Sequence, residues 1–316
     1  MELNPDKNHQ SNSDAKVSLK RLGTELQRLV DDKGEVTTVT LCALLAGGHI
    51  LLEDVPGVGK TTFIKALGKL LGLSIARVQF TSDLLPSDII GVEVYDQSSQ
   101  QFVFHKGPIF TQILLADELN RASPRTQSAL LEAMGEGRVT IDHQTHVLPQ
   151  PFIVFAAQNP VESIGTYELP ESQLDRFAAK LHMGYPSDRR ELEIFQAARR
   201  DPLIDVPSNV IEGESLHQLS SLLDTIHISD QVARYVKRFI DRSRTAAKLR
   251  LGISTRGGVL WLRMARALAI LRDRDFVTPD DLQTLALPCL AHRVLAQADV
   301  TSTEVIRSLL TQVDII

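Results

Sequence analysis

The stretch between His49 and Leu71 constrains the fold of this chain more than any other part of its sequence. An apolar run from His49 to Glu53 predicts a buried strand, and the apolar spacing after Lys60 predicts a helix that reaches Leu71. Between them lies a short loop with glycine at positions 57 and 59. A strand, a glycine-containing loop and a helix in this order bring backbone amides to a helix N-terminus, where they attract an anion. The sequence therefore predicts a phosphate-binding loop.

The side chains of this loop suit a triphosphate and its metal ion. Lys60 supplies a positive charge for the phosphate oxygens, and the Thr61 hydroxyl is a ligand for Mg²⁺. The loop fits the pattern GxxxxGKS/T except that Asp54 stands at its first glycine. Its carboxylate would be repelled by phosphate unless it points away or bonds to its own loop, and the substitution is tolerable because amides further along hold the phosphate. The alternative is a glycine-rich turn that happens to precede Lys-Thr. The predicted cradle comprises Val55, Pro56, Gly57, Val58, Gly59, Lys60, Thr61 and Thr62.

Two further apolar runs end in polar side chains that suit hydrolysis. Asp117 and Glu118 follow Ile113 to Ala116, and Asn159 comes shortly after Phe152 to Ala157. Because parallel strands end at one edge of a sheet, these side chains would lie beside the cradle. There Asp117 would hold Mg²⁺ through its water shell, Glu118 would orient or deprotonate a water, and Asn159 would hydrogen-bond a phosphate or that water. The alternatives are an exposed acidic turn and an Asn-Pro turn.

The order of apolar runs and helical segments predicts an α/β fold with a parallel sheet flanked by helices. Five runs are candidate sheet strands: His49 to Glu53, Ile75 to Phe80, Ile113 to Ala116, Phe152 to Ala157 and Ala178 to Met183. Two β-hairpins are predicted as insertions into this plan: Ile89 to Tyr95 with Gln101 to His105, and Arg138 to Ile141 with His146 to Leu148.

Changes in composition divide the chain of 316 residues into three parts. The start is polar with almost no apolar residue, so residues 1–16 are predicted to be a disordered tail. Residues 17–185 would form the α/β core domain. From Pro186 to Ile316 we find helical periodicity without convincing strands, which predicts a small all-α domain over residues 186–316. Within it, Thr278 followed by Pro279 indicates a helix start.

Charge and cysteine content exclude some classes of protein. The formal charge of −5 provides no overall positive field for nucleic acid or an anionic membrane, although a local basic patch remains possible. The two cysteines, Cys42 and Cys289, lie inside apolar runs and read as buried, reduced thiols. The start has no apolar stretch of the kind found in signal peptides, and no run is suited to crossing a membrane, so we expect a cytoplasmic protein.

Several strings of residues resemble those of the MoxR family of AAA+ ATPases, which is related to the magnesium chelatase ATPase subunit. They lie at residues 55–61, 117–122, 127–134, 158–160 and 165–177, and the last of them, ending Gln-Leu-Asp-Arg-Phe, is the most specific to MoxR. The resemblance covers nearly the whole chain after the start. It implies a P-loop NTPase core with a helical lid that hydrolyses ATP with Mg²⁺ in a homo-oligomeric, hexameric ring.

The same resemblance implies roles for three residues. Asn159 would be the sensor 1 residue, and Arg176 would be the arginine finger that reaches the ATP of a neighbouring subunit. Arg256, within Gly-Ile-Ser-Thr-Arg-Gly at residues 252–257, would be the sensor 2 residue at the γ-phosphate, in its own subunit or a neighbour's. Members of the family often have Pro where Thr255 stands. The alternative for Arg176 is an ion pair with Asp175 or a solvated helix end.

For the biological role, the resemblance implies a chaperone-like remodeller that matures or activates protein clients, including by insertion of metal cofactors. Partners in this family often contain von Willebrand factor A domains. One alternative is a nucleic-acid motor or loader, which the negative charge and the lack of a basic tract around residues 138–148 disfavour. Another is a nucleotide-gated assembly switch with little turnover, which Glu118 disfavours. The inserted hairpins would line the ring pore or face the substrate.

Overall fold

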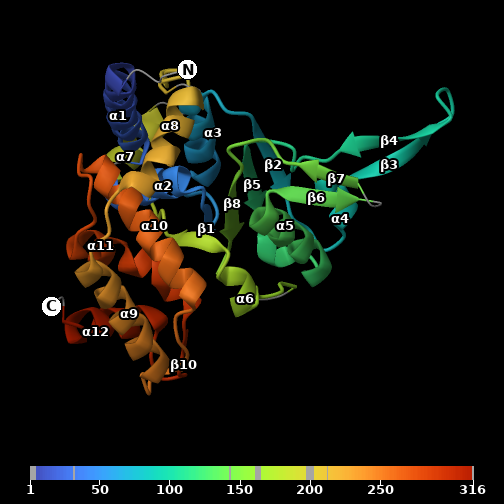
Figure 1. The fold of residues 1–316 in the computed structure, drawn as a ribbon. Coiled ribbons are helices and arrows are strands. Elements are labelled where there is room, and N and C mark those ends of the chain that lie inside the picture. Colours follow the sequence, from blue (N-terminus) through green and yellow to red (C-terminus); the bar gives the residue numbers. More distant parts are fainter. Residues whose placement is uncertain are drawn as a thin grey trace.

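A parallel sheet of five strands forms the centre of the larger part of the molecule (Figure 1). The computed structural model describes residues 5–30, 33–141, 144–160, 165–196, 203–211 and 213–314. The strands lie in the order β2-β5-β8-β1-β9, and every neighbouring pair is parallel. This confirms the five predicted strands: β1 (His49–Glu53), β2 (Ile75–Gln79), β5 (Ile113–Asp117), β8 (Ile153–Gln158) and β9 (Phe177–Leu181).

Successive residues of these strands pack into different layers of the core. In β5, Ile113 and Leu115 belong to one buried cluster, whereas Leu114 and Ala116 belong to the other. The first cluster includes side chains of α1 (Pro5–Leu29), α2 (Gly34–Ala46) and α3 (Lys60–Leu71). The second includes side chains of α4 (Pro86–Ile90), the 3₁₀ turn η1 (Leu119–Arg121) and α5 (Pro124–Glu136). Because both faces are covered, the three inner strands β1, β5 and β8 read as nearly continuous apolar runs in the sequence.

Two antiparallel hairpins are added to this plan, as the sequence predicts. β3 (Gly91–Asp96) pairs with β4 (Gln101–Lys106), and β6 (Arg138–Ile141) pairs with β7 (Gln144–Val147). The turn predicted between β6 and β7 includes residues 142 and 143, which lie outside the described residues. The β3–β4 hairpin projects far from the rest of the molecule (Figure 1).

The N-terminal segment differs from its prediction. The disordered tail predicted over residues 1–16 is wrong from Pro5 onward, because α1 begins there; residues 1–4 lie outside the described residues. Leu19, Leu22 and Leu26 of α1 are buried and hold the helix on the core. Once such a helix is nucleated, adding polar residues at its end costs little compared with nucleation, so composition alone underestimates its length.

The second region is built mainly of helices. They are α7 (Asp188–Gln196), α8 (Gly213–Leu222), α9 (Asp230–Thr245), α10 (Thr255–Leu271), α11 (Pro279–Leu290) and α12 (Ser302–Gln312), with the 3₁₀ turns η2 (Leu223–Thr225) and η3 (Ala291–Arg293). Before this region, α6 (Glu171–Leu174) precedes β9. No helix among the described residues is long and apolar enough to cross a membrane.

The prediction of an entirely helical second region is wrong in one detail. β10 (Leu249–Leu251) pairs with β11 (Leu295–Ala296) in an antiparallel sheet of two strands. Strands of three and two residues are too short to show an alternating pattern, and their partners lie far apart in the sequence. The boundary near Pro186 stays a prediction.

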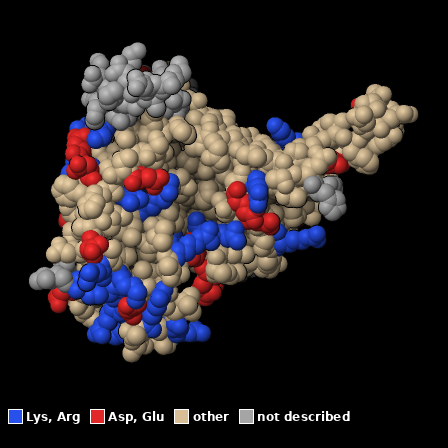
Figure 2. All heavy atoms as spheres, viewed as in Figure 1, with Lys and Arg blue, Asp and Glu red and all other residues tan. Residues whose placement is uncertain are grey.

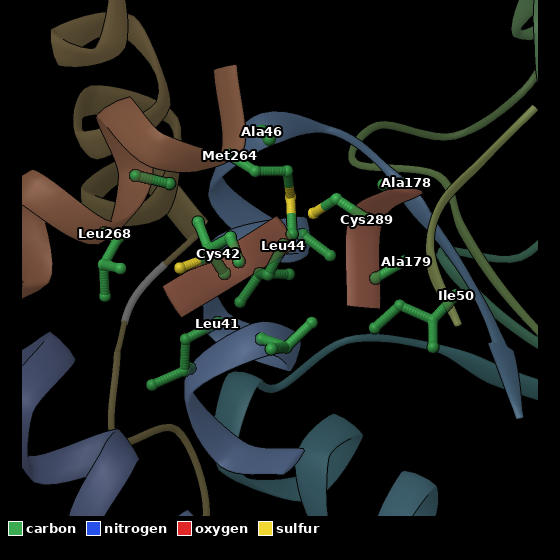
Figure 3. Packing of buried hydrophobic residues seen from close by; sticks show 14 of the residues in the cluster. Leu41, Cys42, Leu44, Ala46, Ile50, Ala178, Ala179, Met264, Leu268 and Cys289 are labelled. Carbon is green, nitrogen blue, oxygen red and sulfur yellow. The ribbon is translucent and has the colours of Figure 1, made fainter. Parts of the chain in front are cut away.

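The first buried cluster continues without a break from the sheet into the helical region. Figure 3 shows Cys42 of α2, Met264 of α10 and Cys289 of α11 close to Ile50 and Ala179 of the sheet. Both thiols are free and buried. Burial raises the pKa of Cys289 to about 12 and places that of Cys42 well above its ordinary value, so both thiols stay protonated and unreactive.

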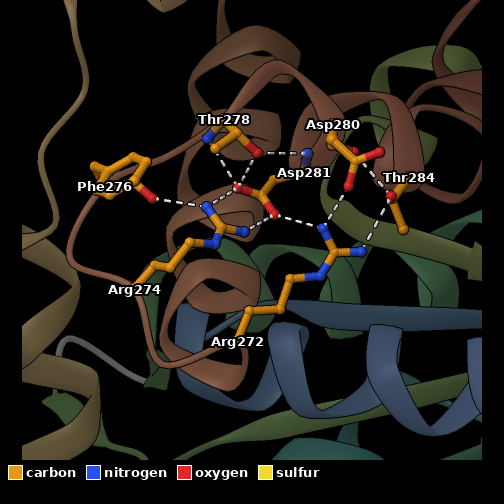
Figure 4. Close-up of polar contacts among 7 residues, drawn as sticks. All are labelled: Arg272, Arg274, Phe276, Thr278, Asp280, Asp281 and Thr284. Carbon is orange, nitrogen blue, oxygen red and sulfur yellow. Dashed lines mark hydrogen bonds and ion pairs between the residues drawn. The ribbon is translucent and has the colours of Figure 1, made fainter.

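The start of α11 is held by a buried carboxylate (Figure 4). Asp281 accepts hydrogen bonds from Arg272 and Arg274, each at 2.8 Å, and from the Thr278 amide at 2.8 Å. Burial raises the pKa of Asp281, but the hydrogen bonds from Arg274 and Thr278 outweigh burial and lower it below its ordinary value. Asp281 therefore stays charged, and Thr278 caps the helix as the sequence predicts.

Two buried histidines are kept neutral by the fold. His49 Nδ1 accepts a hydrogen bond from the Val154 amide at 3.1 Å, so His49 Nε2 carries the proton and donates to the Met134 carbonyl at 3.0 Å. His292 Nε2 donates to the Phe177 carbonyl at 3.1 Å. Burial lowers the pKa of His49 from 6.5 to about 4 and is the main reason why that of His292 falls from 6.5 to about 3.

We predict that the free energy of unfolding falls as the pH drops from 6.5 towards 4. In this range the unfolded chain binds protons on both histidines and the folded chain does not, so each contributes a slope of up to about 1.4 kcal/mol per pH unit. Urea unfolding at several pH values measures the slope. His49→Gln and His292→Gln should each flatten it, and an unchanged slope in both variants would contradict the prediction.

Candidate active site

The carboxyl ends of β1, β5 and β8 meet around one pocket of about 390 Å³. Because β8 lies between β1 and β5, Asn159 lies between the glycine loop and the two acids. The structure thus brings together the loop and the polar side chains that the sequence singles out. The pocket is lined by Pro56, Gly57, Gly59, Lys60, Thr61, Thr62, Arg77, Gln79, Asp117, Glu118, Ala157, Gln158 and Asn159.

The loop has the backbone shape that its glycines permit. Gly57 and Gly59 have φ angles of 87° and 91°, in the left-handed region. A Cβ atom at either position would meet no atom within 4 Å, so the conformation, and not a lack of space, requires glycine. Gly59 caps α3, whose first amides have no partner within the helix and lie at this end of the pocket. Lys60 Nζ donates to the Asp54 carbonyl at 3.0 Å, which keeps its charge at the loop.

Asp54 is buried and its carboxylate points away from the pocket. It accepts the Met183 amide at 2.6 Å and the Gly184 amide at 2.9 Å. Lys33 Nζ donates to carbonyls of the same segment, Gly184 at 3.0 Å and Tyr185 at 2.6 Å. Of the two alternatives for this aspartate, the structure shows the one in which the carboxylate points away. The residue fixes the segment after β9 to the loop after β1.

Valines 55 and 58 of the predicted cradle do not line this pocket. Val58 is buried in the first core cluster, and Val55 packs against that cluster. The two valines anchor the loop to the hydrophobic core, while Pro56 and the residues from Gly59 to Thr62 face the pocket.

Both acids of the pocket are ion-paired. Asp117 Oδ2 lies 2.7 Å from a guanidinium nitrogen of Arg77, and Glu118 Oε2 lies 2.8 Å from one of Arg121. Glu118 also has a left-handed backbone, with φ of 55°, which is uncommon for a residue other than glycine. These pairs balance the negative charge at the edge of the sheet.

Sequence reasoning missed Arg77 and Gln79 of β2. Their side chains line the pocket because they stand at alternate positions near the carboxyl end of a strand next to β5. That alternation, polar at 77 and 79 and apolar at 78 and 80, is the signal that could have found them.

The donor set fits magnesium carried by a phosphate ligand. Thr61 and Asp117 offer a hydroxyl and a carboxylate, the oxygen donors that Mg²⁺ prefers. The described residues contain no group of three or more His, Cys, Asp or Glu that could hold a metal by itself. A magnesium ion here would therefore take its other ligands from phosphate oxygens and water.

A second, apolar pocket of about 260 Å³ opens on the other side of the loop. It shares Gly57, Gly59 and Thr62 with the first pocket. An apolar pocket next to a phosphate-binding loop suits the flat ring of a nucleotide base. The sequence analysis did not predict this pocket. Its remaining lining residues are Leu29, Val30, Lys33, Val58, Phe63, Met183, Pro186, Arg190 and Ile194.

Comparison with known proteins agrees with this geometry. The family model described as "ATPase family associated with various cellular activities (AAA)" matches residues 49–179, and the model "AAA lid domain" matches residues 241–309. The chain is 36% identical to the chaperone MoxR1 of Mycobacterium tuberculosis over 91% of its own length and 78% of that protein. This chain belongs to the MoxR family of AAA+ ATPases. It is therefore an ATP hydrolase with the α/β core and lid of that family.

Two other similar proteins support the same assignment. The uncharacterized protein YeaC of Bacillus subtilis is 46% identical over 85% of this chain and 84% of its own. The crystal structure of a Cytophaga hutchinsonii protein superposes with a TM-score of 0.90 at 33% identity, covering 98% of both chains. The likeness of our MoxR-family chain to this solved structure thus extends over the core and the lid.

The two arginines assigned by resemblance lie outside the pocket of their own chain. The Arg176 guanidinium donates to the Leu131 carbonyl on α5. The alternative ion pair with Asp175 is not formed, because the Asp175 carboxylate pairs with Arg293. Arg256 is exposed in the first turn of α10. Their roles in this MoxR-family ATPase stay predictions.

We predict that Asp54→Gly, which restores the usual first glycine of the loop pattern, destabilises the protein. The amides of Met183 and Gly184 would lose their acceptor, at a cost of about 1–3 kcal/mol. Asp54→Asn, which keeps one acceptor oxygen, should lie in between, and Asp299→Gly in an exposed turn serves as the control. Chemical unfolding measures the change. If the Asp54→Gly variant is as stable as the native chain, the hydrogen bonds of Asp54 to the Met183 and Gly184 amides do not stabilise the fold as predicted.

Proposed function

We propose that this MoxR-family ATPase binds MgATP across its two adjoining pockets. The adenine ring would lie in the apolar pocket, and the triphosphate would follow the loop over Gly57 and Gly59 to the edge of the sheet. Lys60 would neutralise the β and γ oxygens, while Thr61 and Asp117 would hold the magnesium ion, Asp117 through water. The observation that supports this most strongly is the convergence of Lys60, Asp117 and Asn159 on one pocket.

Hydrolysis would depend on Glu118 and Asn159. Asn159 would hydrogen-bond the γ-phosphate or the attacking water without adding charge, and Glu118 would orient or deprotonate that water. One carboxylate oxygen of Glu118, Oε2, is paired with Arg121 at 2.8 Å, and in this arrangement Glu118 already lines the pocket.

We propose that the chain works as a homo-oligomeric ring, a hexamer by family resemblance. Arg176 lies outside the pocket of its own chain, which leaves it able to serve the ATP of a neighbour as an arginine finger. Arg256 at the start of the lid would contact a γ-phosphate in its own subunit or the next. An arginine supplied from a neighbour stabilises transition-state charge only in the assembled ring, which couples hydrolysis to assembly.

The biological output we propose is chaperone-like remodelling of protein clients. One relative, MoxR1 of Mycobacterium tuberculosis, is named a chaperone. The projecting β3–β4 hairpin exposes Val92, Tyr95 and Phe102, side chains suited to contact with another protein. Maturation of proteins by insertion of metal cofactors, and partners with von Willebrand factor A domains, are the more specific forms of this proposal.

We predict that Lys60→Ala lowers the ATPase rate by at least about 100-fold, because the triphosphate loses its fixed positive charge. Lys65→Ala removes an exposed lysine from the same helix and is the matched control. Phosphate release at saturating ATP measures the rate. Full activity of Lys60→Ala would overturn the proposed site.

Mixing two inactive variants tests catalysis between subunits. Glu118→Gln disables a subunit's own pocket, and Arg176→Ala disables the finger that it offers. Mixed rings should recover part of the activity, because the finger of a Glu118→Gln subunit can serve the intact pocket of an Arg176→Ala subunit. A mixture as inactive as its components would show that Arg176 does not act on a neighbour.

A basic surface on the lid favours a second candidate, a nucleic-acid motor. Residues 230–272 hold 11 Lys and Arg against 2 Asp and Glu, a formal charge of +9 in a chain of −5. Figure 2 shows this concentration low on the visible face, around α9 and β10. The sequence reading left a local patch open but did not find this one. Its exposed members are Arg234, Lys237, Arg238, Arg242, Arg244, Lys248, Arg250 and Arg256.

If this second candidate is right, the chain should bind DNA with an affinity that falls steeply with salt, because phosphate contacts release counterions. Fluorescence anisotropy of a labelled oligonucleotide at about 50 and 200 mM salt measures this. Charge reversal of Arg242, Lys248 and Arg250 together should abolish binding, while charge reversal of Arg189 and Arg190 should not. Absence of binding at the lower salt concentration would reject the nucleic-acid candidate.

A further inference from the structure

A buried arginine of the lid holds the main chain on both sides of Arg176. The Arg293 side chain is 1% exposed. One of its terminal nitrogens donates to the Asp175 carbonyl at 3.0 Å and to the Asp175 carboxylate, and the other donates to the Phe177 carbonyl. Its Nε donates to the Cys289 carbonyl at 2.7 Å, which ties the guanidinium to α11. Arg293 therefore grips the residues directly before and after Arg176.

The neighbouring residue of the lid strengthens this grip. His292 Nε2 donates to the same Phe177 carbonyl at 3.1 Å, and His292 is also buried. The segment that carries Arg176 is thus fixed from the side of η3 by two consecutive lid residues.

The side chain of Arg176 leaves this segment toward α5. Its guanidinium donates to the Leu131 carbonyl. Gly135 of the same helix makes room for it, since a Cβ there would lie 2.8 Å from the Arg176 Nη1 atom. The lid therefore holds the backbone of Arg176, and α5 receives its side chain.

Asp175 also connects this segment to the helix that carries Arg256. Its second carboxylate oxygen accepts the Ser254 hydroxyl at 3.0 Å. Ser254 is the N-cap of α10, where its side chain accepts the Gly257 amide at 2.9 Å, and Arg256 lies in the first turn that this cap begins. One carboxylate thus lies between the two segments that carry the arginines assigned by family resemblance.

We propose that Asp175 and Arg293 are positioning residues that set Arg176 for the ATP of a neighbouring subunit and couple it to the lid. This inference rests on the proposed function, in which Arg176 acts in trans. A shift of the lid against the sheet would move η3 and the N-terminus of α10 together, and with them the backbone of Arg176. The state of one subunit's lid would in this way reach the catalytic site of the next.

The chemistry of the ion pair between Arg293 and Asp175 supports a positioning role more than a role in stability alone. A buried ion pair contributes little net stability compared with apolar residues of the same volume, but its geometry is directional. The forked guanidinium binds three carbonyls and a carboxylate at once, which a lysine ammonium cannot reproduce in the same plane.

The decisive variant is Arg293→Lys, which keeps the charge and loses the fork. We expect its kcat to fall by about 10-fold or more with a small change in the KM for ATP, as for loss of an interaction made only in the transition state. The matched control is Arg263→Lys, since Arg263 also lies in the lid and donates to a carbonyl, that of Ala46, at 2.9 Å, far from Arg176 in the sequence. Asp175→Asn is a second variant of nearly the same shape, in case Arg293→Lys does not fold.

Mixed rings separate positioning from a general loss of structure. Arg293→Lys mixed with Glu118→Gln should recover activity, because the latter supplies a correctly placed finger to the former's intact pocket. Arg293→Lys mixed with Arg176→Ala should stay at the level of the components, because neither subunit supplies a finger. Rings made only of the Arg263→Lys control should keep the activity of the native protein.

Each other result has a distinct meaning. Recovery of Arg293→Lys with Arg176→Ala, failure to recover with Glu118→Gln, or full activity of both Arg293→Lys and Asp175→Asn alone, would overturn the positioning role. Failure of the Glu118→Gln and Arg176→Ala mixture would overturn the trans mechanism itself, and the inference with it.

Discussion

The parallel pairing of β1, β8 and β5 is the constraint on which the rest of the structure depends. Parallel strands end at the same edge, and the register pairs Glu53 with Gln158 at the ends of β1 and β8. Neighbouring strands lie about 4.8 Å apart and β8 lies between β1 and β5, so the chain segments that leave this edge start within about 10 Å of each other. A glycine loop, an acidic pair and an asparagine, separated by many residues in the sequence, therefore surround one pocket.

The pocket is held from outside by groups that do not line it. Asp54 takes the amides of the segment after β9, and Lys33 takes carbonyls of the same segment. The negative Asp54 thus binds amide groups of this stretch of backbone, and the positive Lys33 binds its carbonyl groups. Met183 of the same stretch lines the apolar pocket. Asp54, which departs from the phosphate-binding motif, therefore holds the backbone beside the adjoining apolar pocket.

The lid is joined to the sheet by apolar packing and by a few directional polar contacts. The first buried cluster runs from β1 and β9 into α10 and α11, so the two regions share one core in this structure (Figure 3). Apolar packing alone allows small sliding movements, whereas the contacts of Arg293 and Ser254 with Asp175 specify one arrangement. These contacts lie beside Arg176, the residue that we propose acts on the ATP of a neighbouring subunit.

The sequence by itself determined the strands, their parallel class, both hairpins and the loop with its acids, because these depend on local periodicity and on residue types that few other structures use. It did not find Arg77, the apolar pocket, the short β10–β11 pair or the full length of α1. These depend on which strands become neighbours, on how a helix extends beyond its buried part, and on pairing between residues far apart. Only the tertiary structure decided that Asp54 faces away from the pocket and that Asp175 binds Arg293 instead of Arg176. The physical reason is that a charged side chain pairs with whatever the fold brings within hydrogen-bond distance, and adjacency in sequence does not specify that partner.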